Sequence, residues 1–485
     1  MLSLITWSPL IGALIVLMLP KENKRAIQIV SFVAAGISLA ASLWLIPQFD
    51  RSATAMQFVE KWSWIPSLNV SYYLGVDGLS FPLVLLTTFM TFISLIGSLG
   101  IEKRVKEYFF WFLALEVGML GVFMALDLVL FYVFWELTLV PMYFLIGVWG
   151  GPKKEFAAIK FFLYTLTGSV FMLLSILALY FRSVPHTFDM IELMKIAQTS
   201  TVFDPRFQIL VFLGLYFGMA IKIPAFPFHT WLPLAHVEAP TPVSVILAAV
   251  MLKMGVYGIL RISFGITPLG FHWFLPALVV IAVINIVYGA LCALAQTDMK
   301  KMVAYSSINH MGYCLLGIAG MTAAGFSGAV LQMINHGIIA GALFLLVGVI
   351  YDRAHTRDLS AFGGLAVKLP VYAGIMSLAC FASLGLPGLS GFVSEFLCFL
   401  GAFQNWKWAT TISVLGIIAT AAFFLRMMQK VFLGPVNEKW ADLPDMSPRE
   451  LASLLPLVAV MIWFGIDPKW PLDLMNATVA HLLGK

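Results

Sequence analysis

Long apolar runs alternate with short polar segments along almost the whole chain. A run of about 20 residues is long enough for a helix to cross a hydrocarbon core about 30 Å thick. The pattern therefore predicts an all-α polytopic membrane protein with about 14 transmembrane helices. We place these helices at residues 2–19, 27–46, 77–98, 108–126, 128–149, 157–181, 207–226, 243–264, 272–295, 302–320, 326–350, 370–403, 408–433 and 450–466.

The seventh and twelfth predicted helices are interrupted. Pro224 and Pro227 interrupt the seventh, and a segment from Gly385 to Gly391 that contains Pro387 interrupts the twelfth. Broken helices at corresponding places in two halves are typical of transporters with inverted repeats. The breaks lie five helices apart, and because five is odd, the second copy would cross the membrane in the opposite direction. This prediction rests on pattern alone.

The two repeats define the expected domain organisation. Its parts are residues 1–107 with helices one to three, 108–265 with the first antiporter-like repeat (helices four to eight), 266–435 with the second, inverted repeat (helices nine to thirteen), and 436–485 with helix fourteen.

Basic residues in the loops predict the orientation. Odd-numbered loops are rich in lysine and arginine, such as Lys300 and Lys301 in the ninth loop, and even-numbered loops are poorer. By the positive-inside rule, both termini then face outwards, into the periplasm if the membrane is the inner (plasma) membrane of a bacterium. The two long loops, 47–76 and 182–206, would lie on the same outer side. The seventh loop, around Trp231, has no basic residue to orient it.

The composition agrees with a membrane protein and gives no sign of a bound cofactor. Of 485 residues, 61% are hydrophobic and 11% are charged, whereas soluble domains have about 25% charged residues. The net charge of +5 reflects orientation in the membrane rather than nucleic-acid binding, because the basic residues lie in short loops. The sequence has no phosphate-binding loop or dinucleotide motif. The four cysteines, Cys292, Cys314, Cys380 and Cys398, lack metal-ligand or redox spacing. We therefore expect neither a metal nor a cofactor in this chain.

Several ionisable residues lie deep inside the apolar runs. A charged group at the bilayer centre costs about 2.5–3.5 kcal/mol even on the lenient insertion scale, so such groups usually handle ions or protons. Histidine can join a proton relay because its unperturbed pKa is about 6.5. We predict a proton relay formed by Glu136, Lys222, Lys253, His310, His336 and Glu395.

Structural interpretations remain open beside the relay. The carboxylates and lysines could form purely structural ion pairs, and the two histidines could be hydrogen-bonded core residues. For Glu116 in helix four we expect a helix-packing role, and Asp127 is expected to cap helix five. His229, His236 and Glu238, near the seventh helix, could line a watery entrance or form a polar turn.

An ion pair between Glu136 and Lys222 would have the right energy for a proton switch. At about 4 Å and an effective dielectric constant of 20, the attraction between two unit charges is about 4 kcal/mol. Moving one proton against roughly 180 mV costs about the same, at 2.3 kcal/mol per 100 mV. Making and breaking such a pair could therefore be coupled to the transfer of one proton.

Three motifs carry a resemblance to a known family. They are Phe134-Trp135-Glu136-Leu-Thr-Leu-Val-Pro141-Met-Tyr143, His229-Thr-Trp231-Leu-Pro233-Leu-Ala-His236-Val-Glu238-Ala-Pro240-Thr and Ala304-Tyr305-Ser306-Ser307-Ile-Asn-His310-Met-Gly312. Together they closely resemble the antiporter-like membrane subunits of respiratory complex I, the proton-translocating NADH:quinone oxidoreductase. The second motif is most similar to the subunit M group, which includes mitochondrial subunit 4. The resemblance extends from Gly75 to helix thirteen.

The resemblance implies a role for each relay residue. Glu136 and Lys222 would form the pair between helices five and seven, and Lys253 would be the central lysine. The two histidines would line the connecting water path, and Glu395 would be the terminal group. Related antiporter-like subunits usually have a lysine at that last position, so a glutamate fits subunit M.

The same resemblance implies what lies outside this chain. Flavin, iron–sulfur clusters and quinone would belong to partner subunits. This chain would be a non-redox subunit of a translocase, with other membrane-arm subunits and lipid as its neighbours. The alternatives are a subunit of a multi-subunit Mrp-type sodium/proton antiporter, a membrane subunit of a hydrogenase-like or photosynthetic relative of complex I, and a purely structural scaffold.

Overall fold

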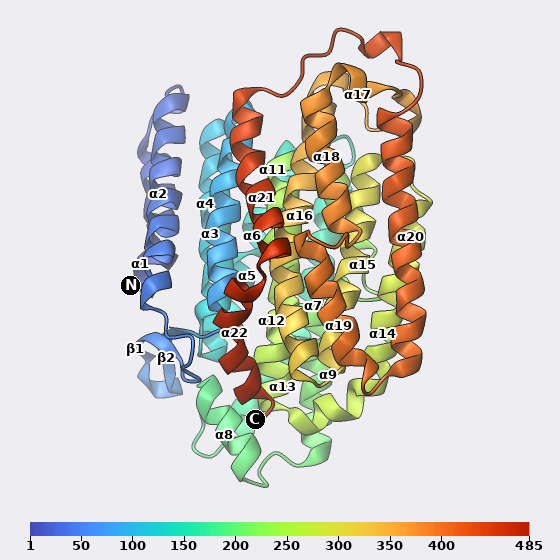
Figure 1. The fold of residues 1–485 in the computed structure, drawn as a ribbon. Helices are drawn as coiled ribbons and strands as arrows, with labels where there is room; N and C mark the ends of the chain where they lie inside the picture. The colour runs from blue at the N-terminus through green and yellow to red at the C-terminus, as the bar shows by residue number, and fades with distance from the viewer. Residues whose placement is uncertain (485) are drawn as a thin grey trace.

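A computed structural model describes residues 1–484, and long helices dominate it (Figure 1). Within this range, ten helical segments are long and apolar enough to cross a membrane. They are α2 (Lys24–Trp44, continued to Gln48), α3 (Phe81–Gly97, continued to Gly100), α4 (Val105–Met124), α5 with α6 (Leu128–Leu137 and Leu139–Trp149), α7 (Lys154–Arg182), α11 to α13 (Thr241–Ile266), α14 (Pro268–Leu294), α16 (Ala323–Ala354), α20 (Lys407–Phe432) and α21 (Pro448–Ile466).

Further helices complete the bundle. Three are shorter but apolar, namely α1 (Leu2–Met18), α18 (Pro370–Ser383) and α19 (Ser390–Phe403). Two others, α9 (Pro205–Lys222) and α15 (Met299–Ala319), are long but carry more polar residues. The predicted fold class, a polytopic helical membrane protein, is confirmed, while the count of fourteen spans stays a prediction.

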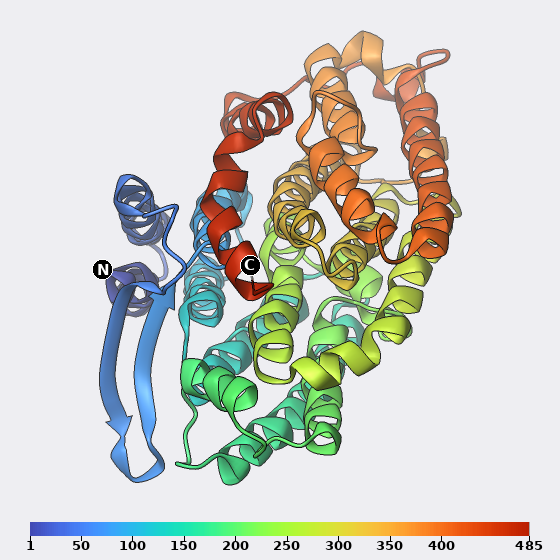
Figure 2. The ribbon, with the colours of Figure 1, turned by 60° about the horizontal axis from the view of Figure 1, so that its bottom comes forward.

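Two helical segments form the centre of the bundle. The membrane-spanning parts of α11 to α13 and of α16 are entirely buried by protein. The other helices pack around them (Figure 2). Because these two segments do not touch lipid, they can carry polar side chains at membrane depth.

Both predicted helix breaks are present. The seventh helix divides into α9 and α10 (Trp231–Glu238), and the twelfth divides into α18 and α19. At the first break, the Asn285 amide accepts a hydrogen bond from the backbone N–H of Phe226 (2.8 Å) and donates one to the carbonyl of Pro224 (3.3 Å). At the second break, the Asn335 amide donates to the carbonyl of Ser390 (2.7 Å). Asn285 thus supplies partners for backbone groups that the first break exposes, as membrane depth requires, and Asn335 connects α16 to the start of α19.

The region around Trp231 was predicted wrongly. We expected helix seven to end at residue 226 and Trp231 to lie in a loop. Instead, Trp231 begins α10 and is 1% exposed. Its indole N–H donates to the carbonyl of Ile221 (2.9 Å), so the second half of the helix is held against the first.

The eighth predicted helix contains two π-helical turns. They span Leu247–Met251 and Ile259–Ser263, on either side of α12 (Leu252–Gly258), and the segment ends with α13 (Phe264–Ile266). π-Helical turns within α-helices are rare and often occur at functional sites. Hydropathy gives no sign of them.

The long loops contain structure that hydropathy does not reveal. Loop 47–76 holds an antiparallel hairpin of β1 (Gln57–Ile65) and β2 (Val70–Val76), and loop 182–206 holds α8 (Met190–Thr199). Lys61 in the hairpin forms an ion pair with Asp189 (2.7 Å), directly before α8. Beyond helix fourteen, α22 (Lys469–Leu482) packs against α3 and α16. The two-stranded sheet is thus a departure from a purely helical fold.

Two pairs of aspartates form matching structures in the two halves. Asp127 and Asp189 lie opposite each other in a short β-bridge, and Asp298 and Asp358 do the same. Each bridge is closed by two backbone hydrogen bonds between the residues that flank the aspartates, with lengths of 2.9 and 2.9 Å in the first pair and 2.9 and 2.8 Å in the second. All four aspartates also cap the helical turn that follows.

The aspartate pairs lie at opposite ends of the bundle. The first pair adjoins α8, and the second lies near α17 (Leu365–Lys368), at the other end of the molecule (Figure 1). This residue-level correspondence supports two inverted repeats. The division at residues 108–265 and 266–435 stays a prediction.

Candidate proton pathway

Lys253 lies at the centre of the bundle, on α12 directly after a π-helical turn. Its side chain is fully buried. The ammonium Nζ donates to the carbonyl of Ala248 (2.5 Å) and lies 2.7 Å from Nδ1 of His336. A protonated lysine can only donate hydrogen bonds. Nδ1 of His336 must then accept, which leaves Nε2 to donate to the Ser307 hydroxyl (3.2 Å).

His310 and Glu395 form a second buried pair next to the first. Nδ1 of His310 lies 3.2 Å from the Glu395 carboxylate, and Nε2 lies 3.0 Å from the Ser383 hydroxyl. Ser383 ends α18 and Glu395 lies on α19, so both sides of the break in helix twelve meet the same imidazole. The break thus places His310 between a neutral hydroxyl and an acid.

The two pairs lie side by side and form one polar array with a gap between the two histidines. The ring centroids of His310 and His336 are 5.2 Å apart. In the described part of the chain, no hydrogen bond connects the two rings directly. Gln332 lies beside them, with its amide nitrogen 3.4 Å from Nδ1 of His310. A proton could cross this gap through one water molecule or by reorientation of a ring. Four of the six predicted relay residues are therefore brought together, in the order Lys253, His336, His310 and Glu395.

Lys222 lies in a separate cluster at the end of α9. Its side chain is 2% exposed, its ammonium donates to the Thr138 hydroxyl (3.2 Å), and it lies 5.1 Å from the centre of the Trp135 ring. An aromatic face stabilises a nearby cation. Glu136 adjoins these residues in sequence. In the part of the chain that the structure describes, no ion pair of 4 Å or less joins Glu136 to Lys222.

Helix five is interrupted at Thr138, the residue whose hydroxyl contacts Lys222. Pro141 has no N–H, so it cannot bond to the carbonyl of Leu137 four residues earlier. The helix divides there into α5 and α6, with Thr138 between them. The predicted Glu136–Lys222 pair therefore stays a prediction, and Thr138 is the partner that the sequence did not suggest.

A buried ion pair between Arg261 and Asp77 was also missed. The guanidinium lies 2.5 Å from the Asp77 carboxylate, and both side chains are at most 3% exposed. Arg261 also donates to the Tyr257 hydroxyl (3.2 Å), which donates to the carbonyl of Phe123 (3.2 Å). Arg261 interrupts the same apolar run as Lys253, so an intramembrane charge was visible in the sequence.

The remaining ionisable candidates occupy different surroundings. Glu116 is fully buried, and neither carboxylate oxygen has a hydrogen-bond partner among residues 1–484. Asp127 caps α5 as predicted. Glu238 accepts a hydrogen bond from the backbone N–H of Lys153 (2.8 Å) and so supports a turn. Lys300 was counted as a loop charge, which is wrong, because Asp298 starts α15 earlier than predicted and buries Lys300 in its first turn.

No group of three or more histidine, cysteine, aspartate or glutamate side chains suited to a metal ion occurs in residues 1–484. The four cysteines are unpaired in the same range.

Comparisons with known proteins show which proteins this chain resembles. A sequence model of the family described as NADH:quinone oxidoreductase/Mrp antiporter, TM, matches residues 125–421. NADH-quinone oxidoreductase subunit M of Rickettsia conorii is 42% identical over 491 residues, covering 100% of this chain and 99% of the relative. Subunit M of Rhodobacter capsulatus is 44% identical over 496 residues, covering 100% and 96%.

Solved structures show the same fold. A chain of respiratory complex I from Thermus thermophilus with bound NADH superimposes with a TM-score of 0.89 at 31% identity, covering 100% of both chains. A chain of the Mrp complex from Dietzia superimposes with a TM-score of 0.88 at 23% identity, covering 99% of this chain and 97% of that one. At that lower identity, the likeness shows the fold alone.

Proposed function

The chain belongs to the family of NADH:quinone oxidoreductase and Mrp antiporter membrane subunits, and from this premise we propose that it is the subunit M-type proton-translocating component of an NADH:quinone oxidoreductase. Electron transfer from NADH to quinone would take place in other subunits, which would hold the flavin, the iron–sulfur clusters and the quinone. This chain would act as a non-redox subunit of the translocase, among other membrane-arm subunits.

The array from Lys253 through His336 and His310 to Glu395 is the observation that carries the proposal. Lys253 lies within hydrogen-bond distance of His336, and His310 lies within hydrogen-bond distance of Glu395. The rings of the two histidines are neighbours, with centroids 5.2 Å apart. Four ionisable groups inside the membrane are costly to insert. A scaffold would have no use for that cost, whereas proton transfer requires groups that gain and lose protons.

Lys222 and Glu136 would control the charge at one end of this array. In the state described here, Lys222 is held by Thr138 and the Trp135 ring. A shift of the lysine side chain towards Glu136 would form the predicted ion pair and neutralise its positive charge. Electron transfer elsewhere would favour one of these two arrangements, and the relay would pass a proton when they exchange.

Glu395 favours this function over a subunit of a sodium/proton antiporter. The resemblance associates a glutamate at this position with subunit M and a lysine with its relatives. The relatives at 42% and 44% identity carry the subunit M name, while the likeness to the Mrp complex is at 23% identity. We propose the bacterial inner membrane as the location. That both termini lie on the outer side of this membrane stays a prediction.

The test uses inverted membrane vesicles that contain the assembled complex with wild-type chain, Glu136→Gln or Glu155→Gln. Glu155 is exposed near the start of α7 and serves as the matched control. NADH oxidation and internal acidification are recorded together, with subunit amounts equalised by blotting. We expect Glu136→Gln to reduce both signals and Glu155→Gln to leave both unchanged.

Two other outcomes would contradict the proposal. Unchanged NADH-driven acidification in Glu136→Gln, together with a loss of sodium/proton exchange, would identify an antiporter. Loss of the assembled complex in native gels for every relay variant would favour a scaffold.

A further inference from the structure

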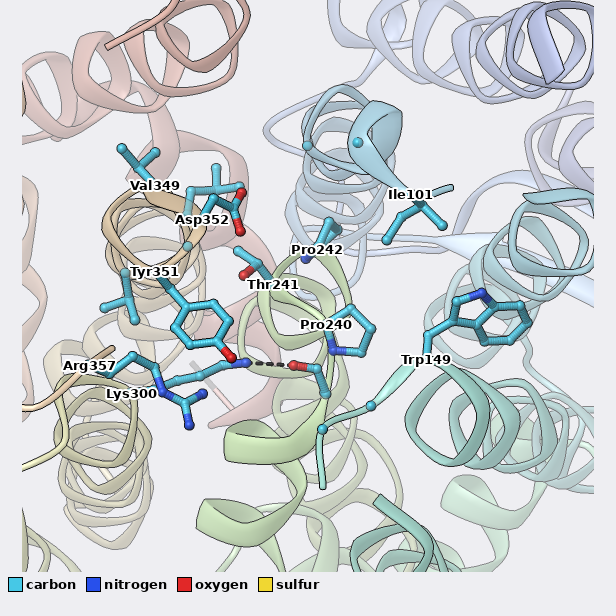
Figure 3. A pocket seen from close by; sticks show the side chains of 18 of the residues that line it. Ile101, Trp149, Pro240, Thr241, Pro242, Lys300, Val349, Tyr351, Asp352 and Arg357 are labelled. Atoms are coloured by element: carbon cyan, nitrogen blue, oxygen red, sulfur yellow. Dashed lines mark hydrogen bonds between the residues drawn. The ribbon is translucent and has the colours of Figure 1, made fainter. Parts of the chain in front are cut away.

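Two of the cavities in the bundle have similar volumes but different linings. The first, of about 390 Å³, has the charged side chains of Lys300, Asp352 and Arg357 in its wall (Figure 3). The second, of about 340 Å³, lies where α2, α3, α16, α21 and α22 meet. Among residues 1–484, all of its lining side chains are leucine, isoleucine, valine, phenylalanine, proline or tryptophan. We call this second cavity the apolar slot.

The lining of the apolar slot suits lipid and not water. A buried water molecule needs about two to four polar partners, which these side chains do not offer. An empty apolar space would deprive its wall of van der Waals contacts. The slot also adjoins the bilayer, because its rim residues Leu43 on α2 and Trp463 on α21 are 49% and 45% exposed. Hydrocarbon from the membrane can therefore reach the slot and fill it.

The apolar slot occupies one half of the bundle. Its residues on α3, between 82 and 89, lie in the first turns of that helix, and Leu39 and Leu43 lie in the last turns of α2. Both of these helix ends adjoin the β1–β2 hairpin (Figure 1). At 1.5 Å per residue, residues 82–89 cover about 10 Å, which is within the roughly 15 Å of hydrocarbon in one leaflet. The slot thus extends from the hairpin side of the membrane towards its middle.

At its deep end, the slot reaches the central helix α16. Ile334 and Ile338 line it there, and residues four positions apart lie on one face of a helix. His336 lies midway between them in sequence and is about 200° away around the helix, at about 100° per residue. The slot therefore adjoins the face of α16 opposite the histidine that contacts Lys253.

A transmembrane helix of another subunit does not match the apolar slot. Such a helix spans both halves of the membrane, whereas the slot is confined to one. Towards the other end of the bundle, a methyl group at Gly97 would lie 3.3 Å from Leu345 of α16, and one at Gly100 would lie 3.6 Å from the Arg449 guanidinium at the start of α21. Arg449 also lines the polar cavity. A single acyl chain, which ends near the middle of the bilayer, matches the slot.

The hairpin end of the slot provides groups for a polar head. Trp470 lines the slot there, and its ring packs against Trp463 with centroids 5.3 Å apart. Tryptophan is enriched where the membrane meets water, so this end lies at the level of the lipid headgroups. Lys469, directly before Trp470, is exposed, and its backbone N–H donates to the Asp467 carboxylate (3.3 Å). The Lys469 ammonium, with three donors, is suited to a phosphate.

We propose that the apolar slot binds one phospholipid from the leaflet on the hairpin side. One acyl chain would fill the slot and end against Ile334 and Ile338, and the phosphate would lie beside Lys469 and Trp470. In the predicted orientation, this is the outer leaflet. The bound chain would support the back of the helix that carries His336. The site requires only a chain in a membrane, so it does not depend on the proposed function.

The test compares two positions that carry a photoreactive side chain. Leu43→p-benzoylphenylalanine places the probe at the rim of the slot, and Leu455→p-benzoylphenylalanine places it on an exposed part of α21 outside the slot. The assembled complex is purified in mild detergent, which replaces loosely held lipid, and is then irradiated. Peptide masses report what each probe has captured. We expect a phospholipid adduct at residue 43 and only detergent at residue 455.

A second pair of variants fills the slot or leaves it open. Val460→Trp adds an indole from the wall of the slot on α21. Ile462→Trp, the matched control, adds the same side chain to an exposed position about 200° away around this helix. Combined with the probe at residue 43, Val460→Trp should abolish the phospholipid adduct and Ile462→Trp should keep it, with the amount of assembled complex checked in native gels.

Several results would overturn the inference. They are the absence of a phospholipid adduct at residue 43, equal adducts at residues 43 and 455, and an adduct that survives Val460→Trp. A crosslink from residue 43 to another polypeptide would instead identify the slot as a contact between subunits. The comparison of the two probe positions decides even if Val460→Trp fails to assemble.

Discussion

The Arg261–Asp77 ion pair allows a quantitative prediction about stability. Removing one member of a buried ion pair costs about 3–5 kcal/mol, because the other charge is left unpaired. Asp77 also accepts hydrogen bonds from the backbone N–H groups of Leu79 (3.0 Å) and Ser80 (3.1 Å) at the start of α3. Asp77→Asn keeps an oxygen for these bonds and removes only the charge. We therefore expect Asp77→Asn to lower the free energy of unfolding by about 3–5 kcal/mol, because the buried guanidinium loses its counter-ion.

The substitution of Arg261 and the double variant complete a double-mutant cycle. Arg261→Met leaves Asp77 with its two backbone donors, so we expect a loss of about 3 kcal/mol, the lower end of the range. The double variant Asp77→Asn/Arg261→Met has no buried charge at this site and keeps the cap. Its loss should be about 1–2 kcal/mol, well below the sum of the single losses, which is the signature of a direct interaction.

The assay is the loss of monodisperse protein on heating, measured by fluorescence-detected size exclusion of the chain fused to a fluorescent protein in mild detergent. We expect both single variants to lose their peak at lower temperature than the double variant. Arg104→Met/Glu107→Gln, which removes an exposed ion pair, is the matched control and should resemble wild type, as exposed pairs contribute at most about 1 kcal/mol. A double variant as unstable as the sum of the single variants would refute the reasoning.

Three further predictions concern other elements. Thr138→Val removes the hydroxyl that holds Lys222 and should lower coupled NADH oxidation, whereas Thr138→Ser should not; equal rates would contradict this role. Gly391→Ala would bring a methyl carbon 2.0 Å from a backbone oxygen at the end of α18, so we expect about 1–3 kcal/mol of destabilisation from overpacking, seen as less assembled complex in native gels. Burial disfavours the charged form of Lys61, but the hydrogen bond and charge of Asp189 outweigh it and raise the pKa of this ammonium. The Lys61–Asp189 ion pair between the hairpin and α8 should therefore persist from neutral pH to about 10 and weaken only above the usual lysine pKa of about 10.4. Lys61→Met should make the hairpin more sensitive to protease at pH 7. A loss of protection of the wild-type hairpin between pH 7 and 9 would contradict the raised pKa.

Features set by local chemistry were predictable from the sequence. Prolines and glycines cannot continue a helix without a cost, so the breaks in the seventh and twelfth helices were visible. Ionisable residues inside apolar runs are equally conspicuous, and the structure brings four of them close together. The start of α15 was predicted at residue 302, where hydropathy rises, but Asp298 caps the helix and it begins three residues earlier, at Met299.

Features that depend on distant contacts were not predictable. Asp77 and Arg261 are 184 residues apart, and only the folded bundle brings them together. Thr138 is an ordinary polar residue in sequence, and only the folded bundle brings its hydroxyl to Lys222, 84 residues away. The hairpin and α8 form outside the membrane, where a hydropathy window gives no information on secondary structure.

The π-helical turn before Lys253 has a consequence for insertions and deletions. Such a turn amounts to one extra residue in an α-helix, so deleting any one residue of Leu247–Met251 would allow a regular helix to form. Hydropathy and span length would hardly change. Because the wide turn already absorbs the extra residue, the shortened and regular helix would leave Lys253 facing nearly the same direction. A deletion of one residue from the regular turn before it, Thr241–Ile246, would instead rotate Lys253 by about 100° relative to the start of the helix. The two deletions leave the same length and nearly the same hydropathy, so the π-helical turn is the one place before Lys253 in this segment where the loss of a residue can be tolerated.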